Sequence, residues 1–417
     1  MRPVRPVREN DAVNTADEHR DTRAEKILVI VGIVVLAFNL RPAAVSIGPV
    51  LNEITGSLGM STTVAGVLTT LPVLAFAGFG ALAPTLARML GIHRVTLVSL
   101  VAVVVGLGLR AETSSVPVFL LLSLLALSGM ATANVLLPSL VKLHFPDKVG
   151  VLTSVYTTSL AVGLTLASVT TVPIANTFGS WRWGLFAWAV TALVAALPWF
   201  VLVRHDRTPE DAPHTITLGE VARTRLGWLM ALFFGLQSLQ AYSVFGWFAQ
   251  IYRDAGFSPA TAGLLLGVIT AMSIPLSFWL PAWAARMEHQ TWLIAALVLC
   301  YPVGYIGLMV APVAGAWLWA VLVGIAAAVF PIALMLIGLR SRTSAGTAAL
   351  SGFTQSVGYL IAAVGPFGVG LLYGITGGWT VPLAALTVLV VPQLVTGLMI
   401  ARPSYVEDQL SRAPATR

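Results

Sequence analysis

Apolar residues gather in twelve long runs that are separated by short polar segments. Most runs approach the roughly 20 residues that a helix needs to cross a bilayer. They lack the alternation of polar and apolar positions typical of barrel strands, and only helices and closed barrels satisfy every backbone group in lipid. The pattern therefore predicts an all-α integral membrane protein with twelve transmembrane helices. The runs cover residues 27–50, 64–87, 95–109, 116–141, 151–175, 183–203, 226–251, 261–285, 291–311, 316–340, 348–374 and 379–401.

The composition supports a membrane protein and excludes other classes. Hydrophobic residues make up 57% of the 417 residues and charged residues 10%, against about 25% charged residues in a typical soluble domain. A net charge of +7 could indicate nucleic-acid binding, but the basic residues are scattered over loop ends instead of gathering on one soluble face. We therefore expect membrane lipid around the protein and no nucleic-acid partner.

The basic residues predict how the helices are oriented, because short cytoplasmic loops collect Lys and Arg. If the amino terminus lies inside, only Arg110, Arg182 and Arg253 of the 24 Lys and Arg residues fall in outer segments. Arg41 lies within a run, and all the others fall in inner segments. This bias predicts a multi-pass protein of the plasma membrane with both termini in the cytoplasm.

The longest internal polar segment, residues 204–225, divides the twelve runs into six plus six. It would be a cytoplasmic linker between two pseudo-symmetric six-helix bundles, residues 27–203 and 226–401. Residues 1–26 carry mixed charges and too little apolar content to fold alone, so they predict a disordered cytoplasmic tail, and residues 402–417 a second tail. Transporters built from repeats bind their substrate near the bilayer midplane between the halves, so we expect a central cavity.

Arg41 is the only charged residue in the interior of a run, about midway along the first. An arginine at this depth costs roughly 2.5–3.5 kcal/mol on insertion scales and usually faces a cavity or a partner. Pro42 should kink the helix and free the carbonyl of Phe38, which Arg41 could satisfy. Alternatively, its guanidinium faces the cavity and binds an anionic or electron-rich solute through paired hydrogen bonds. The two roles are compatible.

Uncharged polar residues inside the runs are further candidates for solute contacts. Such residues more often form hydrogen bonds between helices, worth only about 0.6 kcal/mol on average, so packing remains the alternative for each. Gln240, Tyr156 and Gln355 are the strongest of them. The complete set of predicted substrate-binding residues is Arg41, Asn39, Asn134, Tyr156, Gln237, Gln240, Trp247, Gln355 and Tyr359.

Residues for catalysis, cofactors or metals are missing from the apolar runs. The single cysteine, Cys300, excludes an internal disulfide, and all six histidines lie in polar segments. No phosphate-cradling Gly-rich loop is present, so we expect no enzyme, no cofactor and no metal site. The acid nearest to Arg41 is Glu53, twelve residues further on and about 18 Å away if helical. It is a candidate coupling residue, with a solvated loop charge as the alternative.

Several segments resemble the cyanate and nitroimidazole permease branch of the major facilitator superfamily. The most specific is Asn39-Leu40-Arg41-Pro42-Ala43. Others are Leu137-Pro138 with Phe145-Pro146, Ser180-Trp181-Arg182-Trp183, the segment from Gln237 to Tyr242 and the segment from Leu350 to Tyr359. The resemblance implies alternating access by two rocking bundles around a central site, and a small anion or small heteroaromatic compound as the substrate.

The segment after the second run departs from the superfamily pattern, in which an acidic residue commonly occurs. It reads Gly80-Ala-Leu-Ala-Pro84, followed by Arg88 and Arg94. We keep these two arginines as candidate gating residues, because Arg88 could still engage a helix end.

Together these features predict a monomeric secondary transporter or facilitator for a small-molecule substrate, a small anion such as cyanate or a compact heteroaromatic such as a nitroimidazole. Arg41 cannot lose its proton, so a bound monoanion would neutralise it. This favours exchange or electrogenic uptake over proton symport through a carboxylate. An exporter of hydrophobic drugs and a membrane receptor that does not transport remain alternatives.

Overall fold

The computed structural model describes residues 23–60, 62–206 and 216–410. Within these residues, twelve segments are helical, long and apolar enough to cross a membrane. They coincide with the twelve runs, which confirms the predicted all-α architecture.

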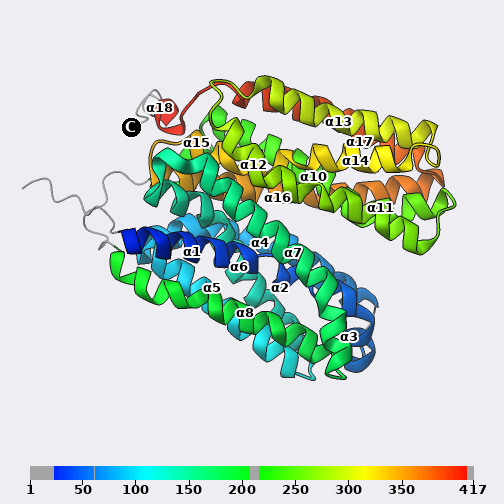
Figure 1. The fold of residues 1–417 in the computed structure, drawn as a ribbon, viewed down its shortest axis with the longest axis horizontal. Coiled ribbons are helices and arrows are strands. Elements are labelled where there is room, and N and C mark those ends of the chain that lie inside the picture. Colours follow the sequence, from blue (N-terminus) through cyan, green and yellow to red (C-terminus); the bar gives the residue numbers. More distant parts are fainter. Residues whose placement is uncertain (1–22, 61, 207–215, 411–417) are drawn as a thin grey trace, which may run out of the picture.

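The first six spans form an amino-terminal bundle (Figure 1). The first span is broken into α1 (Arg23–Asn39), α2 (Pro42–Val45) and the short helix η2 (Gly48–Val50), and α3 (Leu51–Leu58) follows it. The remaining spans are α4 (Thr62–Leu90), α5 (Ile92–Glu112), α6 (Val116–His144), α7 (Val149–Thr177) and α8 (Trp181–Leu202).

The last six spans form the carboxy-terminal bundle. Two of them are broken in the middle, as α11 (Pro259–Ala271) with α12 (Ser273–Ala284), and as α14 (Ala316–Ala327) with α15 (Val329–Leu339). The others are α10 (Arg225–Asp254), α13 (Thr291–Val310), α16 (Ser344–Thr376) and α17 (Thr380–Ile400).

Side-chain caps explain why several helices begin before the apolar run does. Thr224 Oγ1 accepts a hydrogen bond from the Gly227 amide at the start of α10 (3.0 Å). Thr343 Oγ1 accepts one from the Gly346 amide at the start of α16 (3.0 Å). Such caps satisfy amide groups that have no partner within the helix, so polar residues extend the helices past the hydrophobic pattern.

The two bundles meet near the end at which α1 begins and α18 (Val406–Leu410) lies, and they diverge toward the end that carries α3 and α11 (Figure 1). We call the first end the terminal face. Hydrogen bonds between the bundles gather on this side. Ser351 Oγ donates to the Val135 carbonyl (2.7 Å), and the Ala282 amide donates to Ser154 Oγ (3.0 Å). The bundles are therefore joined at the terminal face.

Segments predicted as tails and linker are partly helical. Helix α1 begins at Arg23, inside the predicted tail 1–26, of which residues 1–22 lie outside the described chain. The linker 204–225 contains α9 (Leu218–Val221), and its residues 207–215 are not described. In the segment 402–417, α18 packs against the bundle through buried Val406, and Glu407 Oε1 accepts from the Thr343 amide (3.1 Å). Residues 411–417 lie outside the described chain.

A buried acid ties the amino-terminal bundle together at the terminal face. The Asp206 side chain is 3% exposed and accepts hydrogen bonds from the His93 and Arg94 amides, which begin α5 (3.1 and 2.8 Å). Its Oδ1 also lies 2.8 Å from His93 Nδ1, and His93 Nε2 lies 2.9 Å from His144 Nε2. Burial alone would raise the pKa of Asp206, but these donors hold it below its usual value of 3.8. The carboxylate therefore links α5 to the segment that follows α8, and His93 links α5 to His144 of α6.

Candidate solute-binding site

Arg41 lies at the break in the first span, where it is the residue that precedes α2. Pro42 has no amide hydrogen to continue the α1 ladder, so the helix stops at Asn39 and restarts at Pro42. The Arg41 side chain is half-buried, and its Nε is buried without a hydrogen-bond partner. The guanidinium is therefore held at depth with unmet bonding capacity while part of the side chain stays accessible.

Two aromatic rings flank the Arg41 guanidinium. Its Cζ lies 5.9 Å from the ring centroid of Phe76 in α4 and 5.7 Å from that of Phe330 in α15. These distances fall within the range at which a cation is attracted to the face of a ring. Because Phe76 belongs to one bundle and Phe330 to the other, Arg41 lies between the two bundles.

Two tyrosines of the carboxy-terminal bundle are the electrostatic neighbours of Arg41. They are Tyr242 in α10 and Tyr359 in α16. The Tyr359 ring lies 4.5 Å from the Phe76 ring and 6.3 Å from the Tyr242 ring, and its buried hydroxyl has no hydrogen-bond partner. No carboxylate is among the neighbours of Arg41 in the described part of the chain. We call Arg41, Phe76, Tyr242, Phe330 and Tyr359 the Arg41 cluster.

The chemistry of the Arg41 cluster is that of a donor-rich, aromatic site. A guanidinium offers five N–H donors and no acceptor, and a phenol adds an O–H donor. A solute that brings acceptor atoms or negative charge in a flat shape would complement these groups. The Arg41 cluster therefore offers such a solute hydrogen-bond donors and the faces of aromatic rings.

The predicted glutamines Gln237 and Gln240 lie inside the carboxy-terminal bundle. Gln237 donates to the Tyr301 hydroxyl (3.1 Å) and accepts from Gln393 Nε2 (2.7 Å). Gln240 donates to the Leu386 carbonyl (3.0 Å) and accepts from the Tyr305 hydroxyl (2.9 Å). Both side chains are fully buried and their bonds hold helices together, which is the packing role weighed against binding.

The predicted residues Asn134 and Gln355 bond to each other across the bundles. Asn134 Nδ2 donates to Gln355 Oε1 (2.6 Å), and Gln355 Nε2 donates to Ser351 Oγ (2.8 Å). Their bonds belong to the set that closes the terminal face. Ser139 and Ser344 bond in the same way nearer that face, with their hydroxyl oxygens 2.8 Å apart.

Three other predicted residues lie at different places. Asn39 donates to the Val35 carbonyl (2.8 Å) and accepts from Thr191 Oγ1 (2.7 Å), so it joins α1 to α8. Trp247 donates to the Pro366 carbonyl (2.8 Å) within its own bundle. Tyr156 is 1% exposed, and its hydroxyl has no hydrogen-bond partner. Of the predicted set, the structure places Tyr359 beside Arg41 and joins Asn134 to Gln355.

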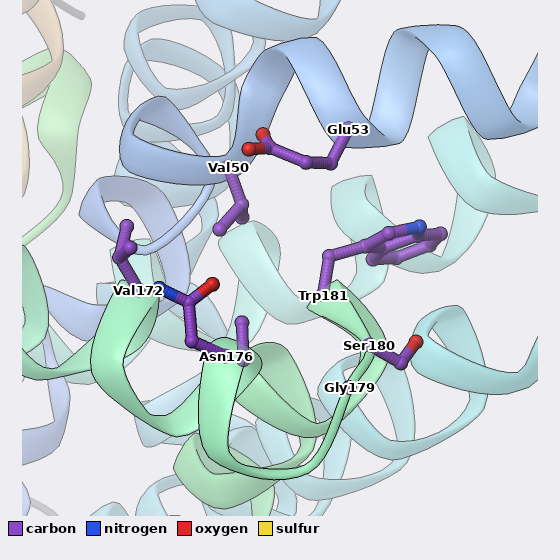
Figure 2. A pocket seen from close by; sticks show the side chains of 8 residues that line it. Val50, Glu53, Val172, Asn176, Gly179, Ser180 and Trp181 are labelled. Atoms are coloured by element: carbon purple, nitrogen blue, oxygen red, sulfur yellow. The ribbon is translucent and has the colours of Figure 1, made fainter.

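The predicted coupling and gating residues are exposed. Glu53 lies on α3, and its carboxylate points over a hollow that Asn176 and Trp181 also line (Figure 2). This cavity of about 370 Å³ belongs to the amino-terminal bundle, not to the Arg41 cluster. Arg88 and Arg94 are exposed at the terminal face, where the inter-bundle bonds come from uncharged residues.

Sequence reasoning missed the other three members of the Arg41 cluster and one more arginine. Phe76 and Phe330 look like any aromatic residue in a span, and Tyr242 stands beside the glutamines that drew attention. Arg110 was assigned to an outer loop, but its side chain is fully buried. A cation at the last turn of an apolar run was the available signal.

The fold is that of a membrane transporter built from two six-helix bundles, and the Arg41 cluster lies between them. The family model described as Major Facilitator Superfamily matches residues 28–366. The chain belongs to the Major Facilitator Superfamily and is a multi-pass membrane transporter of small solutes. A receptor that does not transport is therefore not favoured.

Three relatives place it near the branch that the sequence resembles. It is 33% identical over 383 residues to the 2-nitroimidazole transporter of Escherichia coli (strain K12), covering 90% of this chain and 96% of that one. It is 27% identical over 376 residues to the cyanate transport protein CynX of the same strain, with the same coverage. It is also 38% identical over 393 residues to the uncharacterized transporter YycB of Bacillus subtilis (strain 168), covering 92% and 96%.

A solved structure supports the fold. The superfamily transporter FucP, in the outward conformation, superposes with a TM-score of 0.69 at 12% identity, covering 91% of this chain and all of the other. At this identity the likeness concerns the fold alone.

Proposed function

We propose that this protein carries a small anion or a compact heteroaromatic solute by alternating access, with the Arg41 cluster as its binding site. The observation that carries the proposal is a half-buried guanidinium between the bundles, flanked by aromatic rings, with Nε unbonded. Two relatives are named as transporters of 2-nitroimidazole and of cyanate, and this supports the proposed substrate class. Both compounds are small, flat or linear, and rich in acceptor atoms.

The terminal face is the cytoplasmic face in this proposal, because the basic residues favour that orientation. The bonds that join the bundles there would make the structure the state that is closed to the cytoplasm. Residues 27–203 and 226–401 would rock against each other as two bundles within a monomer of the plasma membrane.

Bound solute would ease reorientation of the carrier. An empty site keeps an unmatched positive charge, whereas a bound monoanion neutralises it. No carboxylate neighbours Arg41 in the described chain, so the Arg41 cluster holds no carrier for a coupled proton. We therefore expect exchange or electrogenic uptake.

A thermal-shift panel on purified protein tests the site. The probes are cyanate, 2-nitroimidazole and benzoate, applied to the wild type, Arg41→Lys and Arg41→Gln. Charge-assisted hydrogen bonds contribute about 1.5–3 kcal/mol, so Arg41→Gln should weaken binding about 10- to 100-fold. Arg41→Lys should recover little of the lost binding, because an ammonium group cannot reproduce the planar, forked donors of a guanidinium.

Arg223→Gln is the matched control, because Arg223 is exposed on the terminal face and the chemical change is the same. It should bind every probe like the wild type. Counterflow of a labelled probe in proteoliposomes then shows whether the bound compound is also moved. If Arg41→Gln and Arg223→Gln bind all probes equally well, the proposed site is wrong.

A further inference from the structure

A second arginine holds the segment that carries Arg41. Arg110 lies in the last turn of α5 and is 0% exposed. Its Nη1 donates to the Ala43 carbonyl (3.2 Å) and its Nη2 donates to Ser46 Oγ (3.3 Å). Ala43 lies within α2 and Ser46 is the residue that ends it. The Arg110 guanidinium therefore holds α2 through two hydrogen bonds.

The orientation of Arg110 is unusual for an arginine near the end of a spanning helix. Such side chains normally extend toward the interface and keep the charge in water. Arg182 lies at the beginning of the neighbouring α8, is only partly buried, and donates to the Ala111 and Thr113 carbonyls at the end of α5. Arg110 instead turns inward, so its bonds to α2 must offset the loss of hydration.

Helix α2 cannot hold its own direction. It has four residues, and its ladder consists of the Ala44, Val45 and Ser46 amides bonded to the Arg41 and Pro42 carbonyls. A single turn fixes several dihedral angles for few hydrogen bonds and is unstable in isolation. Its position must therefore come from its neighbours.

Helix α7 supports the break from another direction. A Cβ on Gly163 would run into the Phe38 carbonyl oxygen, which is the carbonyl that Pro42 leaves without its helical partner. Ser159 Oγ donates to the Val34 carbonyl one turn earlier (2.8 Å). The α1 side of the break is thus fixed by α7, and the α2 side by Arg110.

We propose that Arg110 is a positioning residue for Arg41. It holds α2 through Ala43 and Ser46 so that the guanidinium two residues before Ala43 stays within the Arg41 cluster. Arg110 would thereby set solute affinity without touching the solute. The inference rests on the proposed function of the Arg41 cluster and adds a residue that the sequence assigned to an outer loop.

The test is a mutant cycle between the two arginines, with binding of cyanate, 2-nitroimidazole and benzoate measured up to millimolar concentration. We expect Arg110→Gln to weaken binding of the recognised probe about tenfold, the effect of about one charge-assisted bond. In the Arg41→Gln background the same change should have no further effect, because Arg110 acts through Arg41. Arg110→Lys should recover part of the loss, since a point charge can reach one acceptor but not both.

A second readout does not depend on any ligand. Hydrogen–deuterium exchange of the Ala44, Val45 and Ser46 amides should be faster in Arg110→Gln than in the wild type and unchanged in Arg223→Gln. Ser46→Ala removes one of the two bonds and keeps the buried charge, so it carries the test if Arg110→Gln does not fold. It should increase exchange at the same amides and weaken binding about threefold, as expected for one modest hydrogen bond.

The outcomes separate the two proposals. If Arg41→Gln binds the probes like the wild type, the proposed function fails. If Arg41→Gln loses binding while Arg110→Gln keeps it, or if Arg110→Gln weakens binding equally in both backgrounds, the positioning role is wrong and the proposed function stands. Unchanged exchange in both Arg110→Gln and Ser46→Ala would also contradict the positioning role.

Discussion

Two arginines at one helix break differ in what their guanidinium groups contact and in how exposed they are. Arg110 is fully buried in the amino-terminal bundle, and it donates to a carbonyl and a hydroxyl of α2 while its Nε stays unbonded. Arg41 is half-buried between the bundles, with rings as neighbours and an unbonded Nε. Both are cations in an apolar setting, so burial of charge alone does not mark a site. Partial exposure of the side chain between the two bundles, where aromatic rings flank the guanidinium, distinguishes Arg41.

The largest effect should come from changing each arginine in turn and measuring the stability of the empty protein. Arg110→Gln leaves the Ala43 carbonyl without its donor, so the free energy of unfolding should fall by about 1–3 kcal/mol. Arg41→Gln removes a buried charge that has no matched partner, so the empty protein should become more stable by about 1 kcal/mol. Equilibrium unfolding in detergent measures both. If the two substitutions lowered the free energy of unfolding equally, the proposed difference between Arg41 and Arg110 would be wrong.

The next effect concerns the break that both arginines share. Gly163→Ala places a methyl group against the Phe38 carbonyl, so the first span must shift. Overpacking of this kind destabilises by about 1–3 kcal/mol, and binding at Arg41 should weaken as well. Gly78→Ala is the control, because nothing lies within 4 Å of a Cβ at that helical position. Wild-type stability and binding in Gly163→Ala would show that α7 does not fix the break.

Asp206 is a buried anion whose two carboxylate oxygens both accept hydrogen bonds, so it can be compared with the two arginines. Its pKa is lowered in the folded protein, so its contribution to stability is full above the usual pKa of 3.8 and is lost as the pH falls through the lower folded value. Asp206→Asn should destabilise by about 1–2 kcal/mol at pH 7. The gap between wild type and variant should narrow below about pH 4.

Thermal unfolding as a function of pH measures this gap, with Glu53→Gln as the control because Glu53 is exposed. The groups that face Asp206 are His93, with His144 behind it, and the Arg94 amide. A gap that widens as the pH falls below 4 would contradict the assigned direction.

The smallest effect should come from Tyr359→Phe, which removes one hydroxyl beside Arg41 and leaves the ring against Phe76. A single hydrogen bond contributes about 1 kcal/mol, so solute binding should weaken about fivefold while stability is kept. Tyr252→Phe is the matched control, since that hydroxyl is likewise buried and unbonded but belongs to a ring packed on Phe248 and Phe257. Equal binding in the two variants would show that the Tyr359 hydroxyl faces no solute.

The fold could be predicted from the sequence because lipid makes each span a long apolar run. The run 116–141 corresponds to the helix Val116–His144, and the run 348–374 to Ser344–Thr376. The differences arise at the ends, where capping residues such as Thr343 and polar turns such as Lys142 to His144 continue the helix.

The site could be predicted only in part. Arg41 stood out because a charge in an apolar run is visible without any structure. The hydrogen-bond partners of Gln237 and Gln240 could not be predicted from the sequence. A polar residue in a span looks the same in the sequence whether its side chain faces a neighbouring helix or the other bundle. Arg110 was missed because an arginine at a helix end can direct its side chain either into water or into the protein interior. Which of the two occurs here depends on the broken helix beside it, whose Ala43 carbonyl accepts from Arg110.

The closure of the terminal face has a consequence for how the protein should respond to salt. The bonds between the bundles there join amides, hydroxyls and backbone groups, as in Asn134 with Gln355 and Ser139 with Ser344. Ionic strength screens interactions between charges and leaves those between uncharged dipoles nearly untouched. The balance between the closed and open forms should therefore change little from dilute buffer to concentrated sodium chloride.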